Sequence, residues 1–145
     1  MNNQNPNDIA CILVVDDSAD SLKFLTDVIE KTGDTVLVAL AGQKALDVID
    51  EVTPDVILMD AVMPGMDGFE TCRRLKENSK MLHVPVIFMT GLSDTEHIVE
   101  GFQAGGVDYL VKPINPDELI ARMQVHLANA KMAQSAYVAM DDARR

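Results

Sequence analysis

Runs of consecutive apolar residues alternate along the chain with segments in which apolar residues recur at helical spacing. The runs lie at residues 10–15, 35–40, 56–59, 85–89 and 109–111. A strand that is covered on both faces is apolar throughout rather than at every second position, so each run predicts a buried strand. Between the runs, spacing such as that of Leu22, Leu25 and Ile29 predicts helices. The pattern predicts five strands that alternate with five helices.

Capping and breaking residues mark where several of these helices begin and end. Ser18 can cap the first helix, and Gly33 can end it. Gly105 and Gly106 close the fourth helix. Pro116 suits the first turn of the last helix, which is predicted to run well past Leu127.

Regular alternation of strands and helices is typical of an α/β fold with a parallel sheet and helices on both faces. We expect the doubly wound, flavodoxin-like strand order 2-1-3-4-5, with the first and third strands as neighbours. In such folds, ligands bind beyond the carboxyl ends of the strands, at the point where the strand order reverses. That crevice is therefore the place to look for functional side chains.

Composition narrows the choice of function. The 145 residues weigh 15.8 kDa, which suits one domain. The chain has 12 Lys and Arg and 23 Asp and Glu, which gives a net charge of −11. This charge argues against nucleic-acid binding by this chain alone and against binding to anionic membranes. Cys11 and Cys72 stand apart, and the three histidines lack metal spacing, so we expect buried free thiols and surface histidines rather than a zinc site.

The location of the protein follows from what the sequence lacks. Residues 1–8 are polar and have neither the basic nor the apolar region of a signal peptide. No apolar run approaches the roughly 20 residues that a membrane span requires. We expect a cytoplasmic protein with no membrane contact.

Polar residues follow four of the five predicted strands. Asp16 and Asp17 end the first strand, Asp60 the third and Thr90 the fourth, while Lys112 closely follows the fifth. In a parallel sheet all of them share one edge. A single aspartate at a strand end is usually a turn former or a helix cap. Three carboxylates together repel one another and need a cation, and an all-oxygen set suits Mg²⁺.

An acidic cluster with a divalent ion, one lysine and one hydroxyl is suited to phosphoryl chemistry. The cation and the ammonium neutralise phosphoryl oxygens, the hydroxyl bonds another oxygen, and a carboxylate can attack phosphorus to form an acyl phosphate. Asp60 is the best candidate for the nucleophile because it stands alone at the centre of the edge. Asp16 and Asp17 have the character of a metal-holding pair.

Five separated motifs resemble the receiver domain of two-component response regulators, the CheY-like domain. The matching pieces are residues 14–17, 54–60, 63–68, 89–91 and 105–113. They occur in the order that the family has, and the resemblance covers about residues 9–128. It implies that residues 9–128 are the receiver domain. The flanking residues fall outside the resemblance, and we expect 1–8 to be a disordered leader and 129–145 a helical extension or linker.

The resemblance implies a role for each residue at the predicted edge. Asp60 would accept a phosphoryl group from the phosphohistidine of a sensor histidine kinase or a histidine phosphotransfer protein. Asp16 and Asp17 would bind Mg²⁺, with Asp17, Asp60 and the backbone carbonyl of Val62 as the direct ligands. Lys112 would contact the phosphate.

The resemblance also implies how the signal leaves the site. Thr90 would move toward the phosphate, and the ring of Tyr109 would pack inward behind it. This switch would alter the face made by the fourth helix, the fifth strand and the fifth helix. The peptide bond between Lys112 and Pro113 is similar to the one that is cis in receivers.

Three kinds of function remain open at this point. The first is a phosphorylation-controlled switch that modifies only itself and turns over no separate substrate. The second is an aspartate-nucleophile phosphatase, but these enzymes place a second Asp two residues after the nucleophile, where this chain has Val62. The third is a receiver-like domain that binds partners without phosphorylation. The output is equally open: the chain is a single-domain regulator, a relay intermediate or the receiver half of a longer regulator.

The tail carries its own pattern. After Leu127, residues Ala130, Ala133, Tyr137 and Met140 keep three-four spacing. One helix that extends beyond the domain would explain this spacing, and a frayed linker is the alternative. We expect any homodimer to use either this helix or the face of the fourth helix, fifth strand and fifth helix.

Overall fold

The computed structural model describes residues 9–91 and 95–143, and side chains within them as far as residue 133. The leader that the sequence predicts at residues 1–8 lies outside this part of the chain. No helix in the described ranges is both long enough and apolar enough to cross a membrane.

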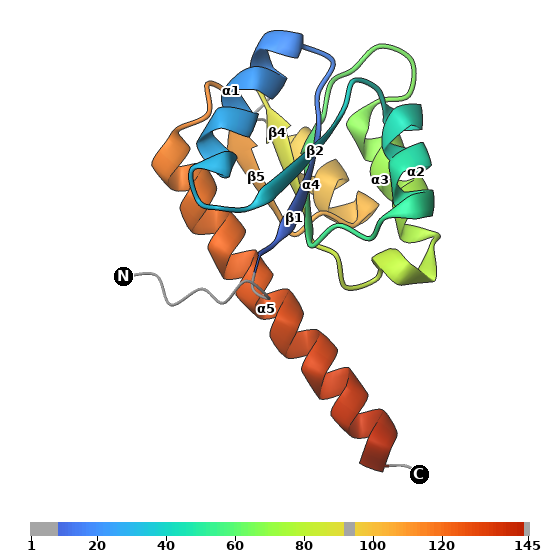
Figure 1. Ribbon diagram of the computed structural model, residues 1–145. Helices are drawn as coiled ribbons and strands as arrows, with labels where there is room; N and C mark the ends of the chain where they lie inside the picture. The colour runs from blue at the N-terminus through green and yellow to red at the C-terminus, as the bar shows by residue number, and fades with distance from the viewer. Residues whose placement is uncertain (1–8, 92–94, 144–145) are drawn as a thin grey trace.

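A five-stranded parallel sheet forms the centre of the domain (Figure 1). Its strands, in chain order, are β1 (Cys11–Val15), β2 (Thr35–Ala39), β3 (Val56–Asp60), β4 (Val86–Thr90) and β5 (Asp108–Val111). They pair in the order β2-β1-β3-β4-β5, and every pairing is parallel. The predicted fold class and strand order are therefore confirmed.

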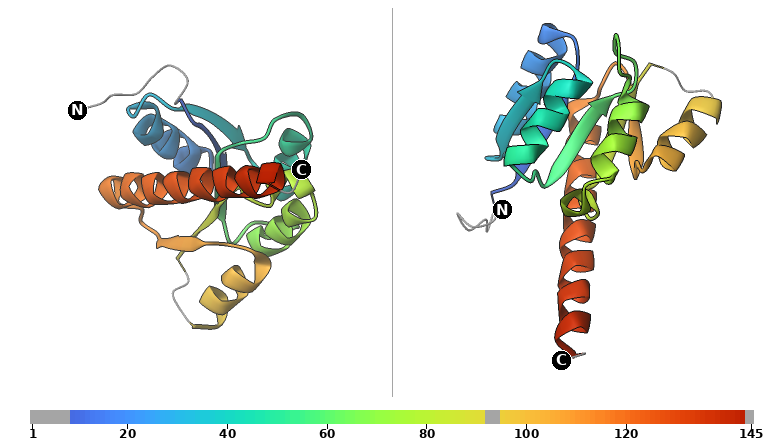
Figure 2. Two further views of the ribbon diagram at one scale, coloured as in Figure 1. Left: turned by 90° about the horizontal axis from the view of Figure 1, so that it is seen from below. Right: turned by 90° about the vertical axis from the view of Figure 1, so that its right-hand side faces the viewer.

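Five α-helices cover the two faces of the sheet. They are α1 (Ala19–Glu30), α2 (Gly42–Glu51), α3 (Gly68–Lys76), α4 (Thr95–Ala104) and α5 (Pro116–Ala143), with a short 3₁₀ turn, η2 (Ser79–Met81). Helices α1 and α5 bury apolar residues on one face of the sheet. The other face is covered by α2, α3 and α4. Helix α5 continues well below the sheet, as both side views show (Figures 1 and 2).

The continuous apolar runs form strands because both of their faces are buried. Every residue of β3 and β4 is buried, and so are four of the five residues in β1. Alternate residues of these strands enter two separate apolar clusters, one on each side of the sheet. Strands β2 and β5 lie at the edges of the sheet and are only partly buried.

Several local predictions can be compared with the structure. The side chain of Ser18 caps α1 by accepting a hydrogen bond from the backbone N–H of Ser21. Gly33 follows α1 with a φ of 89°, a conformation that disfavours residues with a Cβ. The expectation of a surface position is wrong for His126, whose side chain is only 17% exposed. His126 is partly buried because its Nε2 lies 3.0 Å from Oδ2 of Asp108.

Candidate functional site

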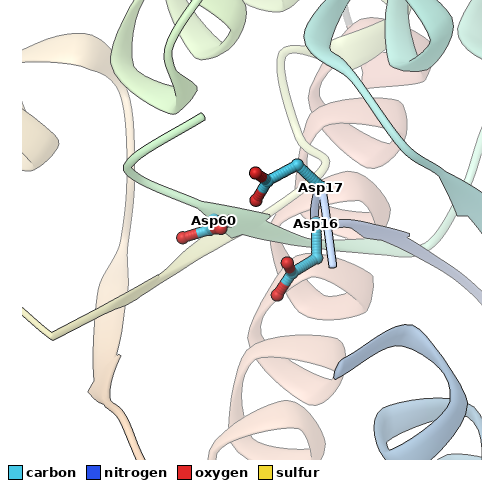
Figure 3. A group of neighbouring side chains, drawn as sticks. All are labelled: Asp16, Asp17 and Asp60. Atoms are coloured by element: carbon cyan, nitrogen blue, oxygen red, sulfur yellow. The ribbon is translucent and has the colours of Figure 1, made fainter. Parts of the chain in front are cut away.

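The carboxyl edge of the sheet, where the five strands end, brings the predicted site residues together. Asp16 directly follows β1, Asp60 and Thr90 are the last residues of β3 and β4, and Lys112 directly follows β5. Asp16, Asp17 and Asp60 each offer a carboxylate oxygen, and these oxygens lie within 4.8 Å of one another. Figure 3 shows the side chains of Asp16 and Asp17 pointing toward the strand that carries Asp60. Because the strands are parallel, residues far apart in sequence meet here.

The three carboxylates differ in burial. Asp16 is fully buried and Asp60 is 4% exposed, whereas Asp17 is exposed. The Oδ1 atom of Asp16 accepts a hydrogen bond from the backbone N–H of Ser18 at 2.9 Å, which fixes the side chain at the start of α1. One acidic group of the cluster therefore faces solvent while the other two are held inside.

Lys112 supplies the positive charge of this cluster. Its Nζ atom lies 3.2 Å from Oδ2 of Asp16 and 3.3 Å from Oδ1 of Asp60. Burial lowers the pKa of Lys112, but the nearby carboxylates of Asp60 and Asp16 outweigh this and raise it above its ordinary value. The peptide bond from Lys112 to Pro113 is cis.

The surroundings of Asp60 disfavour its ionised form. Burial and the charge of Asp16 raise its pKa from 3.8 to about 6, against the opposing effects of Lys112 and the backbone N–H of Val62. Three carboxylates and one ammonium leave an excess of negative charge in a partly dry site. A divalent cation would relieve that excess, and oxygen ligands with one exposed side suit Mg²⁺. Asp16, Asp17 and Asp60 are the residues that could hold it.

The loop after β3 positions Asp60 from its other side. Gly68 begins α3, and a Cβ at this position would overlap the backbone carbonyl oxygen of Asp60 at 2.1 Å. Only glycine therefore lets α3 start this close to the site. Asp67 caps α3 by accepting a hydrogen bond from the backbone N–H of Glu70 at 2.9 Å. The sequence carries a signal for this cap, an acid three residues before Glu70, which the sequence-based predictions did not use.

Thr90 and Tyr109 lie on neighbouring strands and line the same small cavity. Thr90 is buried at the end of β4, and its backbone carbonyl accepts a hydrogen bond from the backbone N–H of Lys112 at 2.8 Å. Tyr109 is partly buried, and its ring meets the edge of Phe102 with centroids 6.4 Å apart. The cavity is thus lined by Thr90 at the end of β4 and by the rings of Phe102 on α4 and Tyr109 on β5.

Aromatic side chains form the far wall of this cavity, which the sequence did not predict. Phe69 from α3 contacts Phe88 at a centroid distance of 5.1 Å and stacks with His97 of α4 at 6.3 Å. All three line the cavity. They come from three separate elements, so spacing along the chain holds no signal for their contact.

A family model for the response regulator receiver domain matches residues 12–124. The chain belongs to this family. MtrA of Mycobacterium tuberculosis, a DNA-binding response regulator, is 40% identical over 116 residues, which are 80% of this chain and 50% of MtrA. A probable cyclic di-GMP phosphodiesterase of Vibrio cholerae is 38% identical over 120 residues, which are 83% of this chain and 27% of the relative.

A solved receiver structure shows the same fold. The chemotaxis protein CheY4 of Vibrio cholerae superposes with a TM-score of 0.78 at 32% identity, covering 80% of this chain and 97% of CheY4. The chain spans about half the length of the MtrA relatives that it matches. Sequences similar to this chain thus occur in a DNA-binding response regulator, in a probable cyclic di-GMP phosphodiesterase and in a chemotaxis protein.

Proposed function

We propose that this receiver domain accepts a phosphoryl group on Asp60 from the phosphohistidine of a sensor histidine kinase or a histidine phosphotransfer protein. The observation that carries the proposal is the convergence of three carboxylates within 4.8 Å on an edge where Lys112 contacts both buried ones. Such an arrangement is costly to maintain unless a cation and an anionic group bind there.

Each residue then has a defined part in the transfer. A carboxylate oxygen of Asp60 attacks phosphorus, the phosphorus–nitrogen bond of the phosphohistidine breaks, and the imidazole nitrogen that leaves takes up a proton. Mg²⁺, held by Asp16, Asp17, Asp60 and the carbonyl of Val62, would neutralise charge on the phosphoryl oxygens. Lys112 is within reach of the same oxygens because its ammonium lies 3.3 Å from the Asp60 carboxylate.

The switch uses the cavity between Thr90 and Tyr109. The Thr90 hydroxyl moves to bond a phosphoryl oxygen, which opens space for the ring of Tyr109 to turn inward. Because Tyr109 contacts Phe102 on α4, its movement changes the surface formed by α4, β5 and α5. Partners that read the phosphorylated state would bind there.

In this proposal the domain turns over no separate substrate. Val62 stands where aspartate-nucleophile phosphatases carry their second Asp, so the second acid that those enzymes use is missing here. Val62 is also 57% exposed. We further propose that residues 9–128 act as the receiver and that residues 129–145 connect it to a partner or to an output. The relatives that carry the domain beside other activities support this division.

The test is intact mass after incubation with acetyl phosphate and Mg²⁺. We expect one added phosphoryl group that hydroxylamine removes, none in Asp60→Asn, and an unchanged yield in Asp20→Asn, an exposed acid nearby on α1. A rapidly hydrolysed acyl phosphate would escape detection, so beryllofluoride binding is measured on the same samples. Absence of both the adduct and Mg²⁺-dependent beryllofluoride binding overturns the proposal, and steady turnover of a phosphomonoester would favour the phosphatase.

A further inference from the structure

Helix α4 packs closely against aromatic side chains at Gly101. The helix lies beside α3 on one face of the sheet, and Gly101 is buried there (Figure 2). A Cβ at Gly101 would lie 3.2 Å from the Phe88 ring and 3.5 Å from the Phe69 ring. Glycine therefore lets the backbone of α4 come close to these two rings, which line the small cavity between Thr90 and Tyr109.

His97 lies on the same face of α4, one helical turn before Gly101, and lines the same cavity. Its ring stacks with that of Phe69, with centroids 6.3 Å apart and an angle of 26° between the planes. Phe69 is itself buried and contacts Phe88. The imidazole of His97 is therefore held at the cavity wall by an aromatic side chain that is fixed in the core.

The ring of Tyr109 lies at a more exposed part of this cavity. Tyr109 is partly buried, and its ring meets the edge of Phe102, which is 50% exposed. Tyr109 pairs with Phe88 across β5 and β4, so both side chains lie on the face of the sheet that α4 covers. The inward turn of the proposed switch would bury the phenol hydroxyl in the cavity. A buried phenol hydroxyl needs a hydrogen-bond partner.

Three further polar side chains line the cavity among the described residues: Thr90, His97 and Asp108. In the proposed switch the hydroxyl of Thr90 bonds the phosphoryl group. The carboxylate of Asp108 already accepts from the backbone N–H of Tyr109 at 2.8 Å and from the guanidinium of Arg122 at 3.0 and 2.9 Å. A neutral imidazole has one nitrogen that accepts a hydrogen bond, so His97 is the member of this set that suits the hydroxyl.

We propose that His97 accepts a hydrogen bond from the Tyr109 hydroxyl once the Tyr109 ring has turned into the cavity. His97 is then a positioning residue, because it stabilises the switched conformation without touching the phosphoryl group. Since His97 belongs to α4, the bond also ties this helix to Tyr109 in the switched state. The inference rests on the phosphoryl transfer to Asp60 that is proposed above.

The affinity for beryllofluoride, which stands in for the phosphoryl group, measures the stability of the switched conformation. A ligand that favours one conformation binds more tightly when that conformation is more stable. In His97→Leu the buried hydroxyl loses its acceptor, so we expect the dissociation constant of beryllofluoride with Mg²⁺ to rise by about tenfold. His97→Gln keeps an oxygen that accepts and should stay within about threefold of the wild type.

Two control variants accompany this measurement. His83→Leu removes a histidine that lies outside the cavity and should leave the affinity unchanged. Tyr109→Phe removes the hydroxyl, after which no group in the cavity needs the acceptor. In the Tyr109→Phe protein we therefore expect His97→Leu to change the dissociation constant by less than about twofold. Far-UV circular dichroism verifies that every variant folds.

The outcomes separate this inference from the proposed function. An equal effect of His97→Leu with and without the hydroxyl would overturn the inference alone, and so would a loss in His97→Gln as large as that in His97→Leu. Absence of Mg²⁺-dependent beryllofluoride binding by the wild type would overturn the proposed function and the inference together.

Tyrosine fluorescence follows the position of the ring directly. The chain has two tyrosines and no tryptophan, so Tyr137→Phe leaves Tyr109 as the sole source of this emission. In that protein we expect beryllofluoride with Mg²⁺ to reduce the quenching of Tyr109 by acrylamide, because the ring leaves the surface. Bound beryllofluoride with unchanged quenching would show that the ring stays outside the cavity, which contradicts the inference.

Discussion

The two edges of the parallel sheet carry charged side chains in different ways. At the amino edge, where the strands begin, several charged groups are held by backbone partners: Asp55 accepts from the N–H of Cys11 at 2.7 Å, and Asp34 from that of Ala10 at 3.1 Å. Lys76 likewise donates to the carbonyl oxygens of Met81 and Val84. At the carboxyl edge, three carboxylates crowd around the single ammonium of Lys112.

This difference distinguishes charged groups that stabilise the fold from charged groups that destabilise it until a ligand binds. A charge that is hydrogen-bonded to backbone groups satisfies those groups and holds two segments together. Carboxylates that repel one another contribute nothing to stability until a ligand binds. The contrast predicts that equivalent substitutions at the two edges change the free energy of unfolding in opposite directions.

The largest effect is expected for Lys76→Met at the amino edge. The substitution keeps the aliphatic bulk but leaves the carbonyl of Val84 without its donor and the carbonyl of Met81 with only the N–H of Val84, so we expect the free energy of unfolding to fall by about 2 kcal/mol. Urea denaturation measures this change. Lys80→Met, at an exposed lysine on η2, is the control and should differ from wild type by less than about 0.5 kcal/mol. An equal loss in both variants would contradict the role of the carbonyl contacts.

The second prediction concerns Asp60→Asn in metal-free protein. Burial and Asp16 raise the pKa of Asp60 to about 6, above its ordinary 3.8, so the folded state binds this proton more tightly than the unfolded state. Stability of the wild type therefore falls as pH rises from about 4 to about 6, and the whole loss is present above that range. Near pH 7 we expect Asp60→Asn to be more stable by about 1–2 kcal/mol.

Urea denaturation with a chelator present, near pH 4 and near pH 7, checks this prediction. The advantage of the variant should be close to zero at the lower pH and complete at the higher one. A constant difference at both pH values would mean that ionisation of Asp60 is not its cause.

Third, Mg²⁺ should relieve the repulsion between the carboxylates at the carboxyl edge. At a concentration about tenfold above its dissociation constant, we expect Mg²⁺ to raise the free energy of unfolding by about 1.4 kcal/mol. Asp17→Asn should abolish this gain with little effect on the metal-free protein, because Asp17 is exposed. Asp20→Asn, another exposed acid close in sequence, should retain it. The measurement is thermal unfolding with Mg²⁺ and with NaCl at equal ionic strength. An equal response of the wild type, Asp17→Asn and Asp20→Asn would indicate a general salt effect instead.

Much of the fold and the site location could be predicted because topology turns sequence position into spatial position. Buried strands such as β3 and β4 are apolar throughout, so the residues that end them, Asp60 and Thr90, stand out. Once the strands are parallel, their last residues must share an edge. The proximity of Asp16 to Asp60 therefore follows from where two apolar runs end.

Contacts between side chains of distant elements could not be predicted in this way. Asp108 on β5 receives two hydrogen bonds from Arg122 and lies 3.0 Å from His126, both on α5. Burial opposes its ionisation, but His126, Arg122 and the N–H of Tyr109 outweigh this and lower the pKa of Asp108. Spacing on α5 places Arg122 and His126 one turn apart but does not say which element they meet. Their partner depends on the packing angle of α5, which no local pattern specifies.

The smallest expected effect is that of Asp55→Asn at the amino edge. The amide keeps an oxygen that can accept from the N–H of Cys11, so only the charge-assisted part of this hydrogen bond is lost. We expect the free energy of unfolding to fall by about 0.5 kcal/mol at neutral pH, measured by urea denaturation beside Asp60→Asn. Both substitutions remove one negative charge from a chain of net charge −11. If Asp55→Asn stabilised the protein as much as Asp60→Asn does, general repulsion would explain both gains; opposite signs can arise only from the local difference between the two edges.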